Sequence, residues 1–224
     1  MAAMAALIFD CDGVLVDSER IALSVERECL AEIGLHYETA DYLNRFVGLG
    51  NADFQAALEL DYQALEGCAL PAGFMEAVRS KCWARFRVEL AAIDGVRPFL
   101  DAYDGMAAVA SSSAIDGLHE KLKLTGLHHL FSPHIYSGQQ VERGKPAPDL
   151  FLFAASRLDR TPEDCLVIED SVNGVRAAVS AGMEVWGFTG GGHADVDLER
   201  RLIHAGAQKI VSNYDELSSK FQSL

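Results

Sequence analysis

Two aspartates separated by one residue stand directly after an apolar run near the start of the chain. Asp10 and Asp12 follow residues 5–9, which predict a buried strand, and Gly13 follows them at a predicted turn. Carboxylates are costly to bury unless they bind a metal or take part in chemistry. One carboxylate can attack phosphorus, while a second gives a proton to the leaving oxygen and later removes one from water. A turn held by two aspartates is the structural alternative.

A serine and a lysine further along the chain could act with this pair. Ser111 follows the apolar residues 107–110, and its hydroxyl with the backbone N–H of Ser112 could hold phosphate oxygens at the start of a helix. Capping of that helix by any of serines 111–113 is the alternative. Lys145, in the segment RGKPAPD, could stabilise charge on a transferring group or be a solvated loop lysine. Arg143 is a substitute cation in the same segment.

A consecutive acid pair follows a third apolar run. Glu169 and Asp170 come after residues 166–168 and precede Ser171. Two adjacent carboxylates repel each other in the absence of a cation. Mg²⁺ prefers oxygen ligands and is held by one or two carboxylates together with phosphate oxygens and waters. The pair therefore predicts a magnesium site, and helix capping by Asp170 or Ser171 is the weaker alternative.

The alternation of apolar runs and amphipathic stretches after residue 90 predicts how these residues meet. Such alternation predicts an α/β fold, with a parallel sheet covered by helices on both faces. Ligands of such folds bind at the carboxyl ends of the strands, and Asp10, Ser111 and Asp170 each follow a predicted end. The predicted strands are residues 107–110, 134–137, 165–168, 185–188 and 209–211, and the predicted helices are 114–125, 149–158 and 172–181, with Gly126 and Gly182 at helix ends.

Residues 18–90 interrupt this alternation and contain almost no strand-like run. Apolar residues from Ile21 to Ile33 fall on one helical face, and those from Phe74 to Leu90 recur every four residues. The sequence therefore predicts a helical cap domain, residues 18–90, inserted into a catalytic core of residues 1–17 and 91–224. A cap on two linkers suits a lid that opens and closes over a site. Glycines 190–192 predict a mobile loop in the core.

Composition and charge exclude several classes of partner. The 224 residues carry a formal net charge of −14, which disfavours nucleic acid and anionic membrane surfaces. No apolar stretch reaches the roughly 20 residues that span a bilayer, and the first residues lack the basic segment of a signal peptide. Five scattered cysteines without a CxxC pair indicate reduced thiols, so we expect a cytoplasmic protein. We expect a monomer, with a dimer as the alternative.

The segments DCDGVLVDSE, KPAPD and EDSVNG, with Ser111 between the first two, resemble the haloacid dehalogenase superfamily over nearly the whole chain. The resemblance implies a Rossmann-like core with an inserted helical cap, and phosphoryl transfer through an aspartyl phosphate. It implies that Asp10 is the nucleophile and Asp12 the acid/base, and Asp12 disfavours the dehalogenase branch. The remaining implied roles are phosphate or substrate binding by Ser111, Ser112 and Lys145, and Mg²⁺ binding by Asp10, the Asp12 carbonyl, Asp170 and Glu169.

These residues together predict a magnesium-dependent phosphatase acting on a small phosphorylated metabolite, such as a sugar or polyol phosphate. The first alternative is a mutase like beta-phosphoglucomutase, which uses a histidine early in the cap, near whose expected place this chain has Ala22, and a cap arginine where this chain has Asn51. The second is a catalytically silent binding protein, which would be expected to have lost a site residue. Candidate substrate contacts in the cap and its linkers are Glu19, Arg20, Arg45, Asn51, Lys81 and Arg85.

Overall fold

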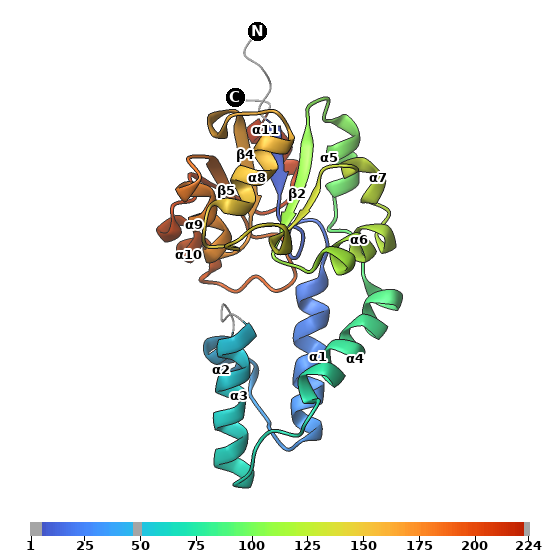
Figure 1. Cartoon of the computed structure of the whole chain (residues 1–224), viewed down its shortest axis with the longest axis vertical. Helices are drawn as coiled ribbons and strands as arrows, with labels where there is room; N and C mark the ends of the chain where they lie inside the picture. Colours follow the sequence, from blue (N-terminus) through green and yellow to red (C-terminus); the bar gives the residue numbers. More distant parts are fainter. Residues whose placement is uncertain (1–5, 47–50, 222–224) are drawn as a thin grey trace. The chain divides into compact units, whose positions relative to one another are not determined.

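The computed structural model describes residues 6–46 and 51–221, and the chain divides into two compact units (Figure 1). The core unit comprises Met1–Glu19 and Leu90–Leu224, and the helical unit comprises Arg20–Glu89. Helix α1 (Ser18–Glu32) therefore begins in the core unit and continues into the helical unit. That the helical unit acts as a cap over the site stays a prediction.

A parallel sheet of six strands forms the centre of the core unit, in the order β3-β2-β1-β4-β5-β6. This is the strand order of Rossmann folds, and it confirms the predicted α/β class. Because β1 lies between β2 and β4, the winding direction reverses beside β1, where ligands of such sheets bind. The strands are β1 (Ala6–Phe9), β2 (Ala107–Ser111), β3 (Ile135–Ser137), β4 (Cys165–Glu169), β5 (Glu184–Phe188) and β6 (Lys209–Val211).

Successive strand residues point to opposite faces of the sheet, so apolar side chains emerge on both faces, and helices cover each of them. Phe9 and Ile168 face one hydrophobic core, packed with α5, α6, α7 and α11, whereas Ile8 and Val167 face a second core with α8, α9 and α10. Both faces are buried, so β1 and the first four residues of β4 are apolar. The helices are α5 (Val96–Ala102), α6 (Ile115–Leu124), α7 (His128–Phe131), α8 (Asp149–Arg157), α9 (Val172–Ser180), α10 (Leu198–Ala205) and α11 (Tyr214–Phe221), with short 3₁₀ turns at Gly138–Gln140 and Pro162–Asp164.

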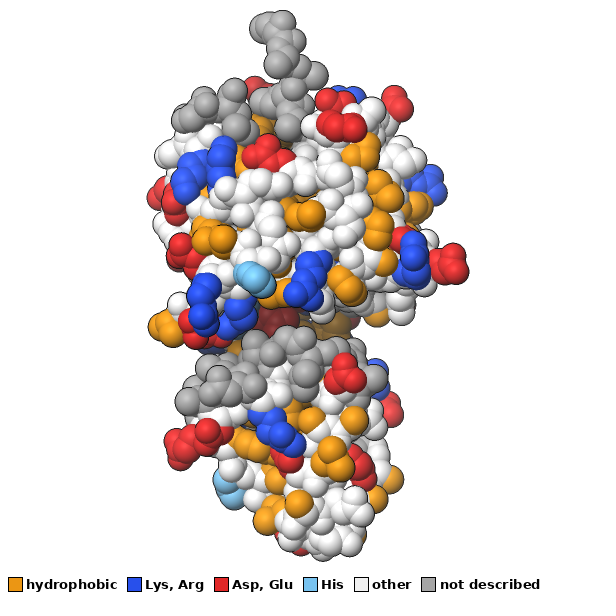
Figure 2. Space-filling view, turned by 90° about the vertical axis from the view of Figure 1, so that its left-hand side faces the viewer, with side chains coloured by type: hydrophobic (Ala, Val, Ile, Leu, Met, Phe, Trp, Pro, Cys, Tyr) orange, Lys and Arg blue, Asp and Glu red, His pale blue; other side chains and the backbone are white. Residues whose placement is uncertain are grey.

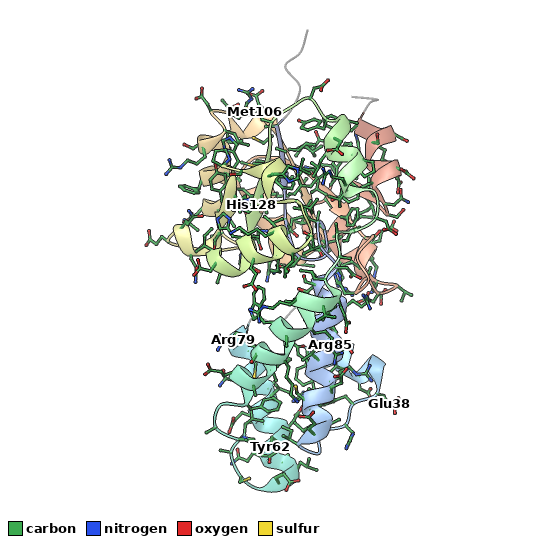
Figure 3. The ribbon with its side chains drawn as sticks, turned by 90° about the vertical axis from the view of Figure 1, so that its right-hand side faces the viewer. Glu38, Tyr62, Arg79, Arg85, Met106 and His128 are labelled. Atoms are coloured by element: carbon green, nitrogen blue, oxygen red, sulfur yellow. The ribbon has the colours of Figure 1, made fainter. Side chains whose placement is uncertain are left out.

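Among its described residues, the helical unit contains the rest of α1 and three further helices, α2 (Thr39–Phe46), α3 (Asn51–Glu66) and α4 (Phe74–Glu89). Helix α4 buries an apolar residue at every fourth position, as its sequence period predicts. Ion pairs join α4 to α1, from Lys81 to Glu32 and from Arg85, labelled in Figure 3, to Glu28. The residues buried on α4 are Phe74, Val78, Cys82 and Phe86.

The surface of each unit is rich in charge of both signs. On the face shown in Figure 2, acidic and basic side chains lie near one another in both units. None of the helices in the described part of the chain combines the length and apolar character that crossing a membrane requires.

Candidate active site

Asp10 follows β1 at the centre of the sheet. Its backbone N–H donates to the carbonyl of Ile168 at 3.0 Å, so strand pairing continues to this residue. The side chain is buried, and Lys145 Nζ donates to Oδ1 at 2.5 Å. Burial raises the pKa of Asp10 well above its ordinary value, Lys145 opposes the shift, and neighbouring carboxylates add to it. A further cation would favour the ionised form that a nucleophile requires.

A tight turn after Asp10 brings the chain against Asp170. Gly13 has φ +76°, and its N–H donates to the carbonyl of Val16 at 2.9 Å. A Cβ added at Gly13 would lie 1.9 Å from Asp170 Oδ2. Only glycine therefore permits both the backbone conformation and the close approach.

The Asp12 carboxylate is held by three donors from three different segments. Lys121 Nζ and Ser18 Oγ both donate to Oδ1, and Ser113 Oγ donates to Oδ2 at 2.8 Å. Burial alone would raise the pKa of Asp12, but Lys121 beside it and the two hydroxyls bring that pKa below its ordinary value. Lys121 lies on α6 and is itself buried, at 6% exposure. Asp12 is thus part of a buried hydrogen-bonded network. An aspartate that only held a turn would not require these three donors.

Three consecutive serines lie at the carboxyl end of β2. Ser111 is the last strand residue, is buried, and its Oγ accepts from the Ser113 N–H at 3.1 Å, whereas Ser112 is exposed. Helix α6 begins only at Ile115, and its N-cap residue, Ala114, makes no side-chain cap. The serines therefore do not cap α6, and that alternative is wrong. Phosphate binding by Ser111 and Ser112 stays a prediction.

Lys145 lies between two carboxylates. Its Nζ donates to Asp10 Oδ1 at 2.5 Å and to Glu169 Oε1 at 2.7 Å, and its side chain is 3% exposed. Although burial lowers the pKa of Lys145, the two carboxylates raise it above its ordinary value. Lys145 is therefore not a solvated loop residue. Arg143, the alternative cation, is exposed and pairs with Asp149 at 2.9 Å.

Glu169 ends β4 and is fully buried. One carboxylate oxygen accepts from Lys145, and the other accepts from the N–H and the hydroxyl of Ser171 at 2.7 and 2.9 Å. Ser171 also caps α9, because its Oγ accepts from the Gly174 N–H at 3.0 Å. A Cβ at Gly174 would lie 1.6 Å from Glu169 Oε1, so this glycine makes room for the carboxylate. The capping alternative thus holds for Ser171 and not for Asp170.

Asp170 contacts a histidine that sequence reasoning missed. His193 Nε2 lies 3.2 Å from Asp170 Oδ2. Burial raises the pKa of Asp170, the contact with His193 opposes that shift, and Glu169 adds to it. The glycines before His193 pack against the turn after β1, since a Cβ at Gly191 would lie 2.7 Å from the Gly13 carbonyl oxygen. Gly191 therefore lies against the turn that follows Asp10 and Asp12.

Asp10 and Asp170 are suited to hold a divalent cation together. Both are buried, and burial raises both pKa values. The like charge of Glu169 raises both further, and that of Asp170 also raises the pKa of Asp10. A cation would offset that charge, and an all-oxygen donor set fits Mg²⁺. Among the described residues no three His, Cys, Asp or Glu side chains converge on one point. A site here would therefore need the Asp12 carbonyl or waters besides the two side chains.

The remaining predicted contacts lie in different surroundings. Glu19, near the start of α1, has a pKa of about 7 because of burial and of the charges of Asp12 and Asp170, which His193 partly offsets. Three basic candidates form ion pairs inside the helical unit, and the side chain of Asn51 lies outside the described residues. These pairs are Arg45–Asp61, Lys81–Glu32 and Arg85–Glu28.

Sequence reasoning missed Ser18, Ser113, Lys121 and His193. A signal for Lys121 was present, because it stands between Leu118 and Leu122 on the buried face of α6, where a lysine is unusual. The two serines carried no comparable signal, since hydroxyl residues are common near helix starts.

Comparison with known proteins identifies relatives over most of the chain. A model of the haloacid dehalogenase-like hydrolases matches residues 4–182. The chain is 30% identical to the 6-phosphogluconate phosphatase of Escherichia coli, covering 86% of each chain. It is 32% identical to the phosphorylated carbohydrates phosphatase of Thermotoga maritima, covering 93% of this chain and 94% of the relative. A haloacid dehalogenase-like protein of unknown function from Agrobacterium tumefaciens superposes with a TM-score of 0.88, at 34% identity and 99% coverage of both chains.

Proposed function

This chain belongs to the haloacid dehalogenase-like hydrolase family, and from that premise we propose that it hydrolyses the phosphate ester of a small phosphorylated carbohydrate. The membership confirms the predicted resemblance, and relatives named as phosphatases confirm the predicted class, a phosphoric monoester hydrolase. The substrate class, the aspartyl-phosphate route and the use of Mg²⁺ are our proposal. The observation that carries it is that the two aspartates have separate buried lysines, Lys145 for Asp10 and Lys121 for Asp12.

In the first step Asp10 attacks phosphorus. Its Oδ1 is bonded to Lys145, and among the described residues no donor is found on Oδ2, which is the oxygen that attacks. A bond forms from Asp10 Oδ2 to phosphorus as the bond from phosphorus to the ester oxygen breaks. Lys145, held in place by Glu169, stabilises the charge on the phosphoryl oxygens, with the Ser111 hydroxyl as a second donor. The negative charge of the bound ester raises the pKa of the Asp12 carboxyl, so that Asp12 takes up a proton from solvent as the ester binds. Asp12 then gives this proton to the leaving oxygen, so the product is a neutral alcohol.

In the second step water releases phosphate from Asp10. Asp12, now a carboxylate, accepts a proton from the attacking water, and the bond from Asp10 to phosphorus breaks. Both aspartates return to their starting states. Bound Mg²⁺, held by Asp10, Asp170 and the Asp12 carbonyl, would supply charge stabilisation to the phosphoryl oxygens. Both carboxylate oxygens of Glu169 already accept hydrogen bonds, from Lys145 and Ser171, so Glu169 would contact the metal through a bound water.

The substrate class is inferred from relatives and from the leaving group. Both relatives described above are named for phosphorylated carbohydrates, which are alkyl esters with poor leaving groups. Such esters need an acid, and Asp12 is present and ordered for that role. The start of α1 has no histidine, and Ala22 stands near the place where the mutase has one, which favours hydrolysis over isomerisation. The five cysteines are free thiols, which supports a cytoplasmic location, and the expected monomer stays a prediction.

A panel of phosphate esters tests the proposal. Purified protein is incubated with 6-phosphogluconate, other sugar phosphates and 4-nitrophenyl phosphate, with Mg²⁺ or with EDTA, and free phosphate is measured. We expect release from at least one sugar phosphate with Mg²⁺ and none with EDTA. Isomerised sugar phosphate without free phosphate would establish the mutase instead. Full activity in EDTA would remove the metal from the mechanism.

A further inference from the structure

Lys121 is a buried lysine at the site that the reaction described above does not use directly. It projects from the buried face of α6, between Leu118 and Leu122, and is 6% exposed. A lone buried ammonium is costly, so it needs carboxylate and hydroxyl partners. Its Nζ donates to Asp12 Oδ1 and, at 2.9 Å, to Ser113 Oγ. Both contacts lead to the same carboxylate, because Ser113 in turn donates to Asp12 Oδ2.

The two oxygens of Asp12 are consequently not equivalent. Oδ1 accepts hydrogen bonds from Lys121 and from Ser18, and these two bonds occupy both acceptor positions of Oδ1. Oδ2 accepts from Ser113, and no second donor to it is found in the part of the chain that the structure describes. One acceptor position therefore stays open on Oδ2 alone.

We propose that Lys121 is a positioning residue that fixes Asp12 so that Oδ2 carries the proton given to the leaving alcohol. The inference rests on the proposed function. Lys121 donates directly to Oδ1 and also to the Ser113 hydroxyl, which in turn donates to Oδ2, so rotation of the carboxylate would break the Lys121–Oδ1 and Ser113–Oδ2 hydrogen bonds. During turnover the Oδ2–H bond breaks as the alcohol O–H bond forms, and the Asp12 carboxylate that remains is stabilised by Lys121. The proton returns to Oδ2 from the attacking water.

This role makes Lys121 a determinant of which esters are cleaved. An alkyl ester leaves as an alkoxide unless it is protonated, whereas an aryl ester leaves readily without an acid. An acid held in one orientation should therefore benefit alkyl esters selectively. Lys145 contacts Asp10 instead, so its effect should not depend on the leaving group.

Leaving-group kinetics test the proposal. We compare wild type, Lys121→Met, Asp12→Ala and the double variant, using 6-phosphogluconate, or the fastest alkyl ester of the panel, and 4-nitrophenyl phosphate. The matched control is Lys123→Met, which removes an exposed lysine from the last turn of the same helix. We expect Lys121→Met to lower kcat on the alkyl ester by roughly 30-fold or more and on the aryl ester by about threefold or less, with KM little changed. Lys123→Met should match wild type on both.

The double variant separates positioning from a general structural effect. If Lys121 acts through Asp12, Lys121→Met should cause no further loss of kcat in the Asp12→Ala background. Removing both partners also leaves no unpaired buried charge, so this variant should fold, as a thermal melt will show. Should Lys121→Met alone fail to fold, Ser113→Ala interrupts the same network and should also lose rate on the alkyl ester selectively.

Four results would overturn the inference. Equal losses on the two esters, or losses that multiply with that of Asp12→Ala, would make Lys121 a structural residue while the proposed function stands. An active Ser113→Ala variant with no leaving-group selectivity would remove the link through Oδ2. A wild type that releases phosphate from no ester would overturn the proposed function and this inference together.

Discussion

Lysines pair with carboxylates in both units of this molecule, but in opposite surroundings. In the core unit the Lys145 side chain is 3% exposed and its partner Glu169 is 1% exposed. In the helical unit Lys81 is 49% exposed and its partner Glu32 is 62% exposed. The distances are similar, at 2.7 and 2.6 Å. Distance alone therefore does not distinguish the two kinds of pair.

Burial decides what each pair does. Water and salt screen an exposed pair, and holding two long side chains together costs entropy, so such pairs contribute little. A buried pair interacts strongly but has lost its hydration, so it adds little to stability unless every polar atom is satisfied. In the core unit each buried lysine makes at least two hydrogen bonds to acceptors. The comparison indicates that the buried lysines serve the chemistry of the site, whereas the exposed lysines keep the surface solvated.

The largest expected effect is that of Asp10→Asn. The amide is nearly isosteric with the carboxylate but attacks phosphorus poorly, so kcat should fall on the order of 1,000-fold or more. A thermal melt close to that of wild type would show that the fold survives. Activity within tenfold of wild type on the best ester would remove Asp10 as the nucleophile.

Lys145→Met should cost about 100-fold in kcat/KM on both alkyl and aryl esters, because the charge that Lys145 stabilises is on the phosphoryl group common to both. Methionine retains the length of the side chain and its contact with the ring of Phe151. Phosphate release from the two esters is the measurement. A loss confined to the alkyl ester would instead indicate that Lys145 assists the departure of the leaving alcohol.

Glu19→Gln should change how stability depends on pH. The raised pKa of about 7 means that the folded state binds the Glu19 proton more tightly than the unfolded state, so stability is lost as pH rises from about 4.5 to about 7. The variant should remove this loss, on the order of 2 kcal/mol for a partly buried group. Urea unfolding in EDTA at pH 5 and pH 8 measures it. The exposed Glu28→Gln is the control, and an unchanged pH difference in Glu19→Gln would contradict the prediction.

Lys81→Met should have the smallest effect. Lys81 pairs with Glu32 across an exposed surface, and loss of the pair should move Tm by about 2 °C or less. A larger drop, particularly one insensitive to 0.5 M salt, would show that surface pairs in the helical unit carry more than the comparison allows.

Much of the core fold could be predicted because local patterns determine it. Each predicted strand after residue 90 is present within one residue at either end, since runs such as residues 165–168 are buried on both faces. Gly126 and Gly182 follow helices with φ of +71° and +75°, as helix ends favour. Residues 1–5, which include the predicted start of the first strand, lie outside the described part, and β1 is described from Ala6.

The site was harder to predict where long-range contacts determine it. The acid pair at Glu169 and Asp170 was visible as a motif, but the sequence does not show that Glu169 is bonded to Lys145, 24 residues earlier. Lys121 reaches Asp12 across 109 residues, and neither residue indicates the other. The glycine triplet lies in a loop, as its composition predicts, but the sequence does not show that Gly191 packs against Gly13, far away in the chain.

The position of β1 has a consequence for when the site can exist during synthesis. Leu7 pairs with Ala107 on one side, and Ala6 pairs with Cys165 on the other. During synthesis Asp10 and Asp12, the proposed catalytic aspartates, therefore precede the second neighbour of their strand by more than 150 residues. Contacts of such long separation form late, because closing long loops costs entropy before the pairing is gained. The carboxylates at the start of the chain thus meet Lys145 and Asp170 only once most of the chain has left the ribosome.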